Sequence, residues 1–107
     1  NLAETSTIMV SGGGSVNISG NERINYIDVS GFSGGTINSN TIWHGIISNL
    51  SGIHVEVPNK PSGSFTINSN EIRVYDYSVS PISITGWGGD INVLVDRNLI
   101  NIQLFTN

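Results

Sequence analysis

Apolar and polar residues alternate along most of the chain, which is the pattern of β-strands that bury one face. In residues 52–57, Ile53, Val55 and Val57 fall on one side of an extended strand, and His54 and Glu56 fall on the other. Isoleucine, valine, threonine and aromatic residues dominate the apolar set, as strands prefer, and no window shows a helical stripe. Strands are therefore predicted over residues 5–10, 15–19, 24–29, 41–47, 52–57, 64–67, 71–77, 82–85, 90–95 and 99–105.

Turn-forming residues separate these segments. Glycine-rich stretches lie at residues 11–14, 33–35 and 86–89, and proline or asparagine turns lie at 58–61 and 96–98. Short strands at intervals of roughly 8–12 residues are typical of β-sandwiches and small barrels. We therefore expect an all-β fold, a small antiparallel sandwich or barrel of jelly-roll type. The 107 residues are enough for a single domain, residues 1–107, with its own core, and too few for two.

The pentapeptide TINSN occurs twice, at residues 36–40 and 66–70. Asparagine tolerates left-handed backbone conformations and serine favours turns, so each copy predicts a strand, a tight turn and a second strand. Three explanations are open: independent use of one turn, an old hairpin duplication, and successive coils of a β-helix. Solenoids need at least about three repeats, and the pentapeptide has no third copy in the sequence. We therefore favour independent use of the same turn.

Composition disfavours several kinds of partner. Charged residues make up only 11% of the chain, the net charge is -4, and the four cations are scattered. Without a basic stripe, a nucleic acid and an anionic membrane surface are poor partners. No apolar run approaches the length of a membrane span, so insertion into a membrane is not expected. The absence of cysteine excludes disulfides, cysteine–zinc sites and thiol catalysis. The many Gly, Ser and Asn residues favour contacts with sugars through directional hydrogen bonds.

His54 and Glu56 are the first candidates for binding, because a histidine and a carboxylate on one strand face can hydrogen-bond sugar hydroxyls. A solvated outer face would show the same pattern. Trp87 lies in the glycine loop 86–89, and Asp90 directly follows this loop. Glycines leave its ring few local packing partners, so the ring is available to stack on a sugar, unless it folds back onto the edge of the sheet.

Further candidates follow the two TINSN copies. Trp43 and His44 come just after the first copy, and Arg73 follows the second. Arg73 alternates with Tyr75 and Tyr77, which predicts either a polar aromatic patch or a contact between subunits.

Catalytic and metal sites have weak support in the sequence. There is no G-x-S-x-G elbow. A carboxylate pair for glycoside hydrolysis can be drawn from several acids, but nothing singles out two of them: Glu56, Glu71, Asp76 and Asp90. Two histidines without close histidine partners make a poor metal site, and calcium binding by Asp76, Asp90 or Asp96 stays open, although no EF-hand spacing is present. We expect neither a cofactor nor a bound metal.

The segment GIHVEVPN (residues 52–59), followed by GSFT (63–66), resembles the C-terminal head domains of receptor-binding proteins from lactococcal tailed phages. Those heads carry a His-x-Asp strand, an Asn/Pro turn and a Gly-Ser-Ile-Thr strand leading to a tryptophan. In this chain Glu56 stands for the aspartate, and the tryptophan segment matches residues 84–88 at a longer spacing. The resemblance covers about a third of the chain. It implies a saccharide site on a trimeric β-barrel head, with His54, Glu56, Trp87 and, less directly, Arg73 as its residues.

The resemblance therefore implies a non-enzymatic protein of the virion. It would recognise host cell-wall polysaccharide at the tip of a phage tail, acting at the outer surface of the host cell. The partners would be two further copies in a homotrimer, the polysaccharide, and other tail or baseplate proteins reached through a region preceding Asn1. Two alternatives stay open: a bacterial adhesin or carbohydrate-binding module, and a fragment of a polysaccharide-degrading tail spike.

Overall fold

The computed structural model describes residues 7–44, 51–57, 63–74, 80–86 and 92–102. These residues form strands joined by short turns and contain no helix, and so none that could cross a membrane. The strands are β1 (Thr7–Ser11), β2 (Ser15–Ser19), β3 (Tyr26–Ser30), β4 (Gly34–Asn38), β5 (Thr41–His44), β6 (Ile53–Glu56), β7 (Ser64–Asn68), β8 (Glu71–Val74), β9 (Ile82–Thr85), β10 (Asn92–Asp96) and β11 (Leu99–Ile102).

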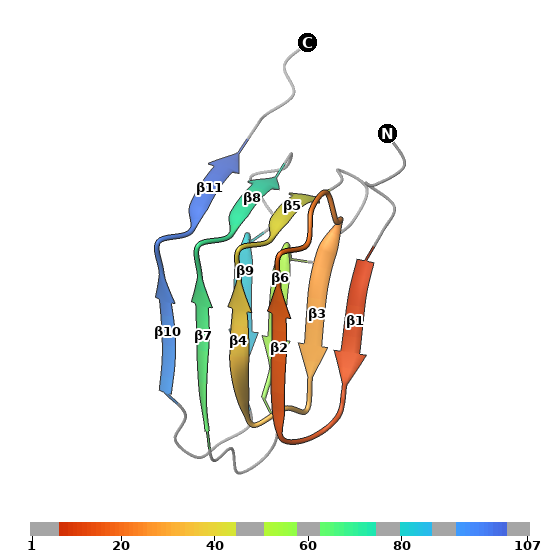
Figure 1. Cartoon of the computed structure of the whole chain (residues 1–107), viewed down its shortest axis with the longest axis vertical. Coiled ribbons are helices and arrows are strands. Elements are labelled where there is room, and N and C mark those ends of the chain that lie inside the picture. Colours follow the sequence, from red (N-terminus) through yellow and green to blue (C-terminus); the bar gives the residue numbers. More distant parts are fainter. Residues whose placement is uncertain (1–6, 45–50, 58–62, 75–79, 87–91, 103–107) are drawn as a thin grey trace.

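The strands form three parallel sheets wound into a β-helix (Figure 1). Sheet A has the order β1-β3-β6-β9, sheet B the order β10-β7-β4-β2, and sheet C the order β11-β8-β5. The chain visits A, B and C in turn and then returns to A, so β3, β4 and β5 make one coil and β6, β7 and β8 make the next. The first coil contains β1 and β2 and closes at Ile24, which bridges to Ile42 of β5. The last coil contains β9, β10 and β11.

The prediction of an all-β fold is confirmed, and the prediction of an antiparallel sandwich or barrel is wrong. Every strand pairing among the described residues is parallel. Alternation reports only that a strand buries one face, which is equally true of a parallel strand in a β-helix. Parallel neighbours need a long crossover, and here each crossover is made by the other two sheets of the coil.

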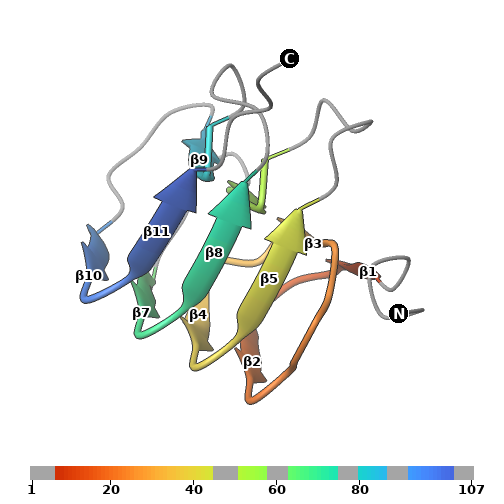
Figure 2. The same cartoon turned by 90° about the horizontal axis from the view of Figure 1, so that it is seen from above.

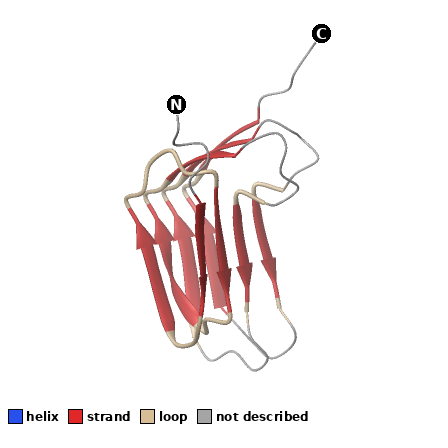
Figure 3. Ribbon diagram, turned by 90° about the vertical axis from the view of Figure 1, so that its right-hand side faces the viewer, coloured by secondary structure: helices blue, strands red, loops and turns tan. Residues whose placement is uncertain are grey.

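Side chains that point inward stack in rows along the helix axis and form the core. One row runs through Ile18, Ile37, Ile67 and Val95, and the sheet C row runs through Ile24, Ile42, Ile72 and Ile100. Sheets A and B face each other as two layers, with sheet C across one end of the space between them (Figure 3). Seen from above, β5, β8 and β11 lie side by side (Figure 2). The alternating apolar residues of each strand therefore point inward and form the core.

Gly35 serves the interior in a different way. It lies in the row between Val16 and Phe65, with a φ of 153° that favours glycine. A Cβ at this position would collide with the backbone carbonyl oxygen of Val16. The bare backbone of β4 thus permits close approach of the first coil, and the expected turn at residues 33–35 is instead partly the start of this strand.

A ladder of asparagines fixes the corner between sheets B and C. Asn21, Asn40, Asn70 and Asn98 occupy this corner in four successive coils. The Nδ2 of each donates to the Oδ1 of the next, at 2.9, 3.0 and 2.9 Å. The backbone N–H groups of the first three also donate to the next Oδ1, at 3.0–3.1 Å. Asn40 and Asn70 are each only 1% exposed, so these bonds satisfy amides that are out of contact with water.

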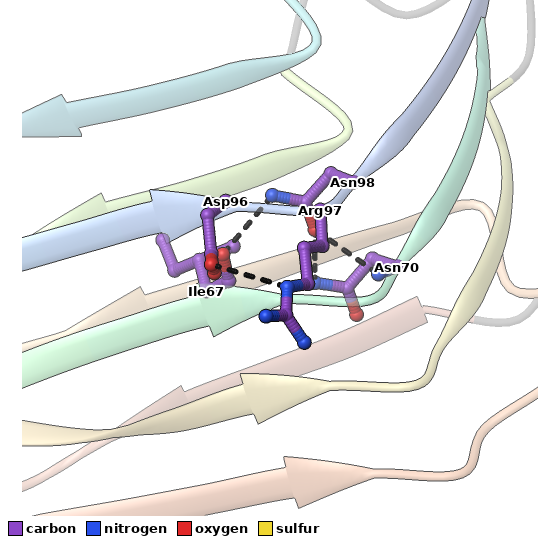
Figure 4. A network of polar contacts seen from close by, with 5 residues as sticks. All are labelled: Ile67, Asn70, Asp96, Arg97 and Asn98. Carbon is purple, nitrogen blue, oxygen red and sulfur yellow. Dashed lines mark hydrogen bonds and ion pairs between the residues drawn. The ribbon is translucent and has the colours of Figure 1, made fainter.

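Three of the ladder asparagines also donate to the backbone of the sheet B strand in the preceding coil. Nδ2 of Asn40, Asn70 and Asn98 donates to the carbonyl oxygens of Ile18, Ile37 and Ile67, respectively, at 3.0–3.1 Å. Figure 4 shows the last of these contacts, together with the ion pair between Asp96 and Arg97 at 3.7 Å. The residue before each asparagine has a positive φ, which turns the chain sharply out of sheet B: Gly20 (74°), Ser39 (59°), Ser69 (58°) and Arg97 (56°).

The two TINSN copies are therefore successive coils of a β-helix, and the preference for independent use of one turn is wrong. Each copy does make strand, turn and strand, but the second strand enters another sheet instead of pairing back on the first. Two further copies exist in degenerate form, ISGN at residues 18–21 and VDRN at residues 95–98. They keep the asparagine and the left-handed residue before it, the two features that the corner requires.

Candidate functional site

The outer face of sheet A carries polar side chains on every coil. His54 and Glu56 point outward from β6, because Ile53 and Val55 are buried on the inner side. Both polar residues are half-buried. The prediction that His54 and Glu56 share one strand face is thus confirmed for their placement, while their role in binding stays a prediction.

Neighbouring strands place more polar groups beside this pair. In register, Asp28 lies next to His54 on one side and Ser83 lies next to it on the other. Ser30 and Thr85 flank Glu56 in the same way. We call the outward residues of this region the sheet A face; its members are Met9, Ser11, Tyr26, Asp28, Ser30, His54, Glu56, Ser83 and Thr85.

A shallow hollow of about 150 Å³ lies at the β1 side of the sheet A face. It is lined by Met9, Val10, Ser11, Asp28 and Ser30. The hydroxyl of Tyr26 donates to the sulfur of Met9, one of these lining residues, at 3.5 Å. The hollow is smaller than the roughly 300–1,000 Å³ of a typical small-molecule pocket. A small molecule of ordinary size would therefore be enclosed only in part.

The chemistry of the sheet A face is that of hydrogen bonding to hydroxyl groups. The carboxylates of Asp28 and Glu56 accept, and the hydroxyls of serine and threonine both donate and accept. Within the described part of the chain, neither carboxylate forms an ion pair with lysine or arginine. The described residues contain no group of three His, Asp or Glu side chains close enough to hold a metal ion.

Sheet C presents a different cluster on its outer face. The guanidinium groups of Arg23 and Arg73 each lie 5.0 Å from the centroid of the Trp43 ring. Arg23 belongs to the coil before Trp43 and Arg73 to the coil after it, so the ring is contacted from both directions along the axis. Trp43 Nε1 and Arg73 Nε are buried and have no hydrogen-bond partner.

The contacts of Trp43 change the interpretation of this residue. The guanidinium groups of Arg23 and Arg73 thus lie against the ring from the coils on either side of it. These contacts make Trp43 part of a clamp that joins three coils, and its role in binding a sugar stays a prediction. Trp43 and Arg73 therefore do not join His54 and Glu56 in one site, because they project from sheet C and not from sheet A.

The other predicted site residues are placed less fully. His44 is the last residue of β5, in register with Val74. Trp87 and Asp90 lie outside the described residues, as do Tyr75, Tyr77 and Asp76.

Sequence reasoning missed Asp28, Ser30 and Ser11 as neighbours of the predicted pair. A signal for them exists in the repeat itself, because IMVS (8–11), IDVS (27–30), IHVE (53–56) and ISIT (82–85) align as successive strands of sheet A. The second and fourth positions of this alignment are the outward ones.

No protein-family model, curated protein or solved structure gives a significant match to this chain.

Proposed function

We propose that this protein binds saccharides without cleaving them, and that a glycan lies across the sheet A face. The observation that supports the proposal is the repetition of carboxylate and hydroxyl groups on successive strands, from Ser11 and Asp28 to His54, Glu56 and Thr85. Parallel neighbours are spaced by about 4.8 Å, which is comparable to the rise of an extended glycan per sugar unit. Successive coils can thus contact successive sugars through several weak hydrogen bonds.

The biological setting that we propose is host recognition by a phage tail. The chain would bind host cell-wall polysaccharide as a homotrimer at the tail tip, and several weak sites would add through avidity. This part of the proposal rests on the resemblance of residues 52–66 and 84–88 to phage head domains. Those heads are β-barrels, whereas this chain forms parallel coils, so the support comes from the segments alone. A bacterial adhesin or a carbohydrate-binding module would use the same face with the same chemistry.

Polysaccharide cleavage is the second candidate, because Asp28 and Glu56 lie diagonally across neighbouring strands of one face. A strand spacing of about 4.8 Å and two residues of rise separate their Cα atoms by roughly 8 Å. Inverting glycosidases hold their carboxyl groups at roughly 6.5–9.5 Å. A Cα separation of this size is compatible with carboxyl groups at that distance, which is the one feature that favours cleavage with inversion.

Titration calorimetry with cell-wall polysaccharide purified from lactococci tests both candidates. Glu56→Gln, Asp28→Asn and His54→Ala each remove part of the sheet A face, and Glu71→Gln is the matched control, a half-buried outward glutamate on sheet C. A net hydrogen bond contributes about 0.5–1.5 kcal/mol, so each sheet A variant should bind about 2- to 10-fold more weakly. The control should bind like wild type.

The melting temperature of each variant shows whether the change acts through folding. If all three sheet A variants bind as tightly as the wild type and melt at the same temperature, the polysaccharide does not bind at the sheet A face. A separate assay measures the release of reducing ends from the polysaccharide. If the wild type releases them and both Asp28→Asn and Glu56→Gln do not, the protein cleaves the polysaccharide, and the second candidate function holds. Sedimentation of the wild type as a stable monomer at micromolar concentration would argue against the trimer and in favour of the adhesin or module.

A further inference from the structure

The last coil leaves apolar side chains exposed where the coils before it bury them. Val95 and Ile100 point into the helix like Ile67 and Ile72, in register. Ile67 and Ile72 are 0% exposed, whereas Val95 and Ile100 are each 43% exposed. The outward residues of this coil are apolar too, with Leu94 at 55% and Leu99 at 62%.

These four residues, Leu94, Val95, Leu99 and Ile100, lie beside unpaired strand edges. Among the described residues no strand pairs with the outer edges of β9, β10 and β11, and none pairs with the outer edges of β1 and β2 at the other end. Such edges carry rows of backbone N–H and C=O groups that can pair with another strand. The first and the last described coils have the same sheet arrangement, because both belong to one repeating helix.

The asparagine ladder gives the two ends opposite hydrogen-bonding character. Within the ladder, each Oδ1 accepts from the preceding coil, and each backbone N–H and Nδ2 donates to the following coil. At Asn21, the first rung, the acceptor position therefore faces away from the helix. At Asn98, the last rung, the donor position faces away. A donor end and an acceptor end of the same register are complementary.

We propose that the last coil binds the first coil of a second copy of this chain, head to tail. The ladder would continue from Asn98 to Asn21 of the second copy, and the inner rows would continue from Val95 to its Ile18 and from Ile100 to its Ile24. β10 and β2 each have five residues, so they can pair along their whole length. In that register Leu94 lies beside Asn17 of the second copy, as it lies beside Thr66 within the chain.

A symmetric end-to-end dimer fits this surface less well. Joining two last coils would put the donor position of one Asn98 against the donor position of the other, and it would pair the strands antiparallel. A head-to-tail contact uses two different surfaces and repeats without closing, so it produces an open stack. Continued stacking would also align the sheet A faces of successive copies in one line.

Disulfide cross-linking tests the register directly, since the chain has no cysteine of its own. Leu94→Cys and Asn17→Cys change exposed residues of β10 and β2. In the proposed stack their Cα atoms are about 4.8 Å apart, within the roughly 4.4–6.8 Å that a disulfide spans. The two variants, mixed in equal amounts and oxidised with copper–phenanthroline, should give a dimer that contains one copy of each. The double variant should give a ladder of dimers, trimers and longer products on a non-reducing gel.

Ser15→Cys is the matched control, because this exposed residue lies two positions along β2 from Asn17 and roughly 8 Å from residue 94 of a stacked copy. Its yield with Leu94→Cys should be at least about fivefold lower, as its separation exceeds disulfide reach. Equal yields from the two mixtures would overturn the register. Dimers of the Leu94→Cys variant alone, at a yield equal to that of the mixture, would show a symmetric contact instead.

Sedimentation of the cysteine-free wild type provides a second readout. Its average mass should rise steadily with concentration, and Leu94→Lys, which places a charge at the contact, should shift that rise to at least about tenfold higher concentration. A mass that stays constant over the whole concentration range, at that of one chain or of the proposed trimer, would overturn the head-to-tail contact; a constant trimer mass would leave the proposed trimer standing.

Discussion

Removal of one rung of the asparagine ladder should destabilise the whole helix. The side chain of Asn70 takes part in four hydrogen bonds: Nδ2 donates to Ile37 O and Asn98 Oδ1, and Oδ1 accepts from the N–H and the Nδ2 of Asn40. Asn70→Ala would leave the two Asn40 donors and the Ile37 carbonyl without these partners. Asn40 and Asn70 are each 1% exposed, so water does not replace the lost bonds.

The size of the effect follows from these four bonds. At about 0.5–1.5 kcal/mol net for each, the loss is about 2–6 kcal/mol, and the unpaired buried groups favour the upper half of that range. Domains of this kind have a total stability of about 5–15 kcal/mol. A loss of about 4 kcal/mol corresponds to a fall in melting temperature of about 15–30 °C.

Thermal and urea unfolding followed by far-UV circular dichroism measures the change. Asn17→Ala is the matched control, because Asn17 is an exposed asparagine of β2, and its loss should change stability by less than about 0.5 kcal/mol. A fall of less than about 1 kcal/mol for Asn70→Ala would refute the reasoning, since it is below the contribution expected of even two such bonds.

Asn70→Asp separates hydrogen bonding from packing. The substitution keeps the shape of the side chain but replaces the Nδ2 donor by an oxygen that faces the Ile37 carbonyl and Asn98 Oδ1. Burial beside acceptors raises the pKa of the new carboxyl above its value in the unfolded chain, so stability should fall as the pH rises through that folded-state pKa and recover in acid. If packing alone mattered, this variant would melt like the wild type at every pH.

Three further substitutions test the corner, the core and the clamp. Ser39 has a φ of 59°, which glycine adopts easily and a β-branched residue does not. Ser39→Gly should therefore leave the melting temperature unchanged or raise it slightly, and Ser39→Val should lower stability by about 1–2 kcal/mol in urea unfolding. Equal effects of the two substitutions would contradict backbone strain at this corner. Gly35→Ala should lower stability by about 2 kcal/mol or more, because its Cβ collides with the Val16 carbonyl; a variant that melts like wild type would show that β4 can shift. Trp43→Ala should lower stability by about 2 kcal/mol, because the contacts with Arg23 and Arg73 are lost. Its glycan affinity in calorimetry should equal that of the wild type. A loss of affinity in the folded variant would show that Trp43 belongs to the binding site.

Strand positions could be predicted from the sequence because alternation is a local property. Strands β2 and β9 have the predicted bounds, and the other predicted segments overlap observed strands. The start of β4 was missed because Gly34 and Gly35 were interpreted as a turn, although Gly35 is needed there for close contact between coils. The direction of pairing could not be predicted, since a strand with one buried face has the same pattern in a parallel and in an antiparallel sheet.

The sequence contains the repeat, but a search for identical residues finds only two of its four copies. The requirement of at least three repeats was sound, and four are present. All four share an asparagine, a preceding residue with positive φ and an apolar residue three positions before the asparagine. The residue directly before the asparagine is serine in both TINSN copies, and Gly20 and Arg97 take its place in the other two. A search for the spacing of asparagines after apolar strands, instead of for the pentapeptide, would have found Asn21 and Asn98.

Two residues of the sheet A face followed from local pattern, and the others required the register between coils. His54 and Glu56 share a face because they are two residues apart in one strand. Asp28 reaches His54 from 26 positions earlier, and only the parallel register brings it there. The contacts of Trp43 also required the register, since Arg23 and Arg73 reach its ring from neighbouring coils; its role in binding stays a prediction.

The measurement that tests the proposed function most directly is a titration of the isotope-labelled protein with lactococcal cell-wall polysaccharide, followed by two-dimensional amide NMR. The largest shift changes should fall on β3 and β6, at and beside Asp28, Ser30, His54 and Glu56, with little change on β5 and β8. Changes centred on sheet C around Trp43, or no changes at saturating polysaccharide, would contradict a glycan site on the sheet A face.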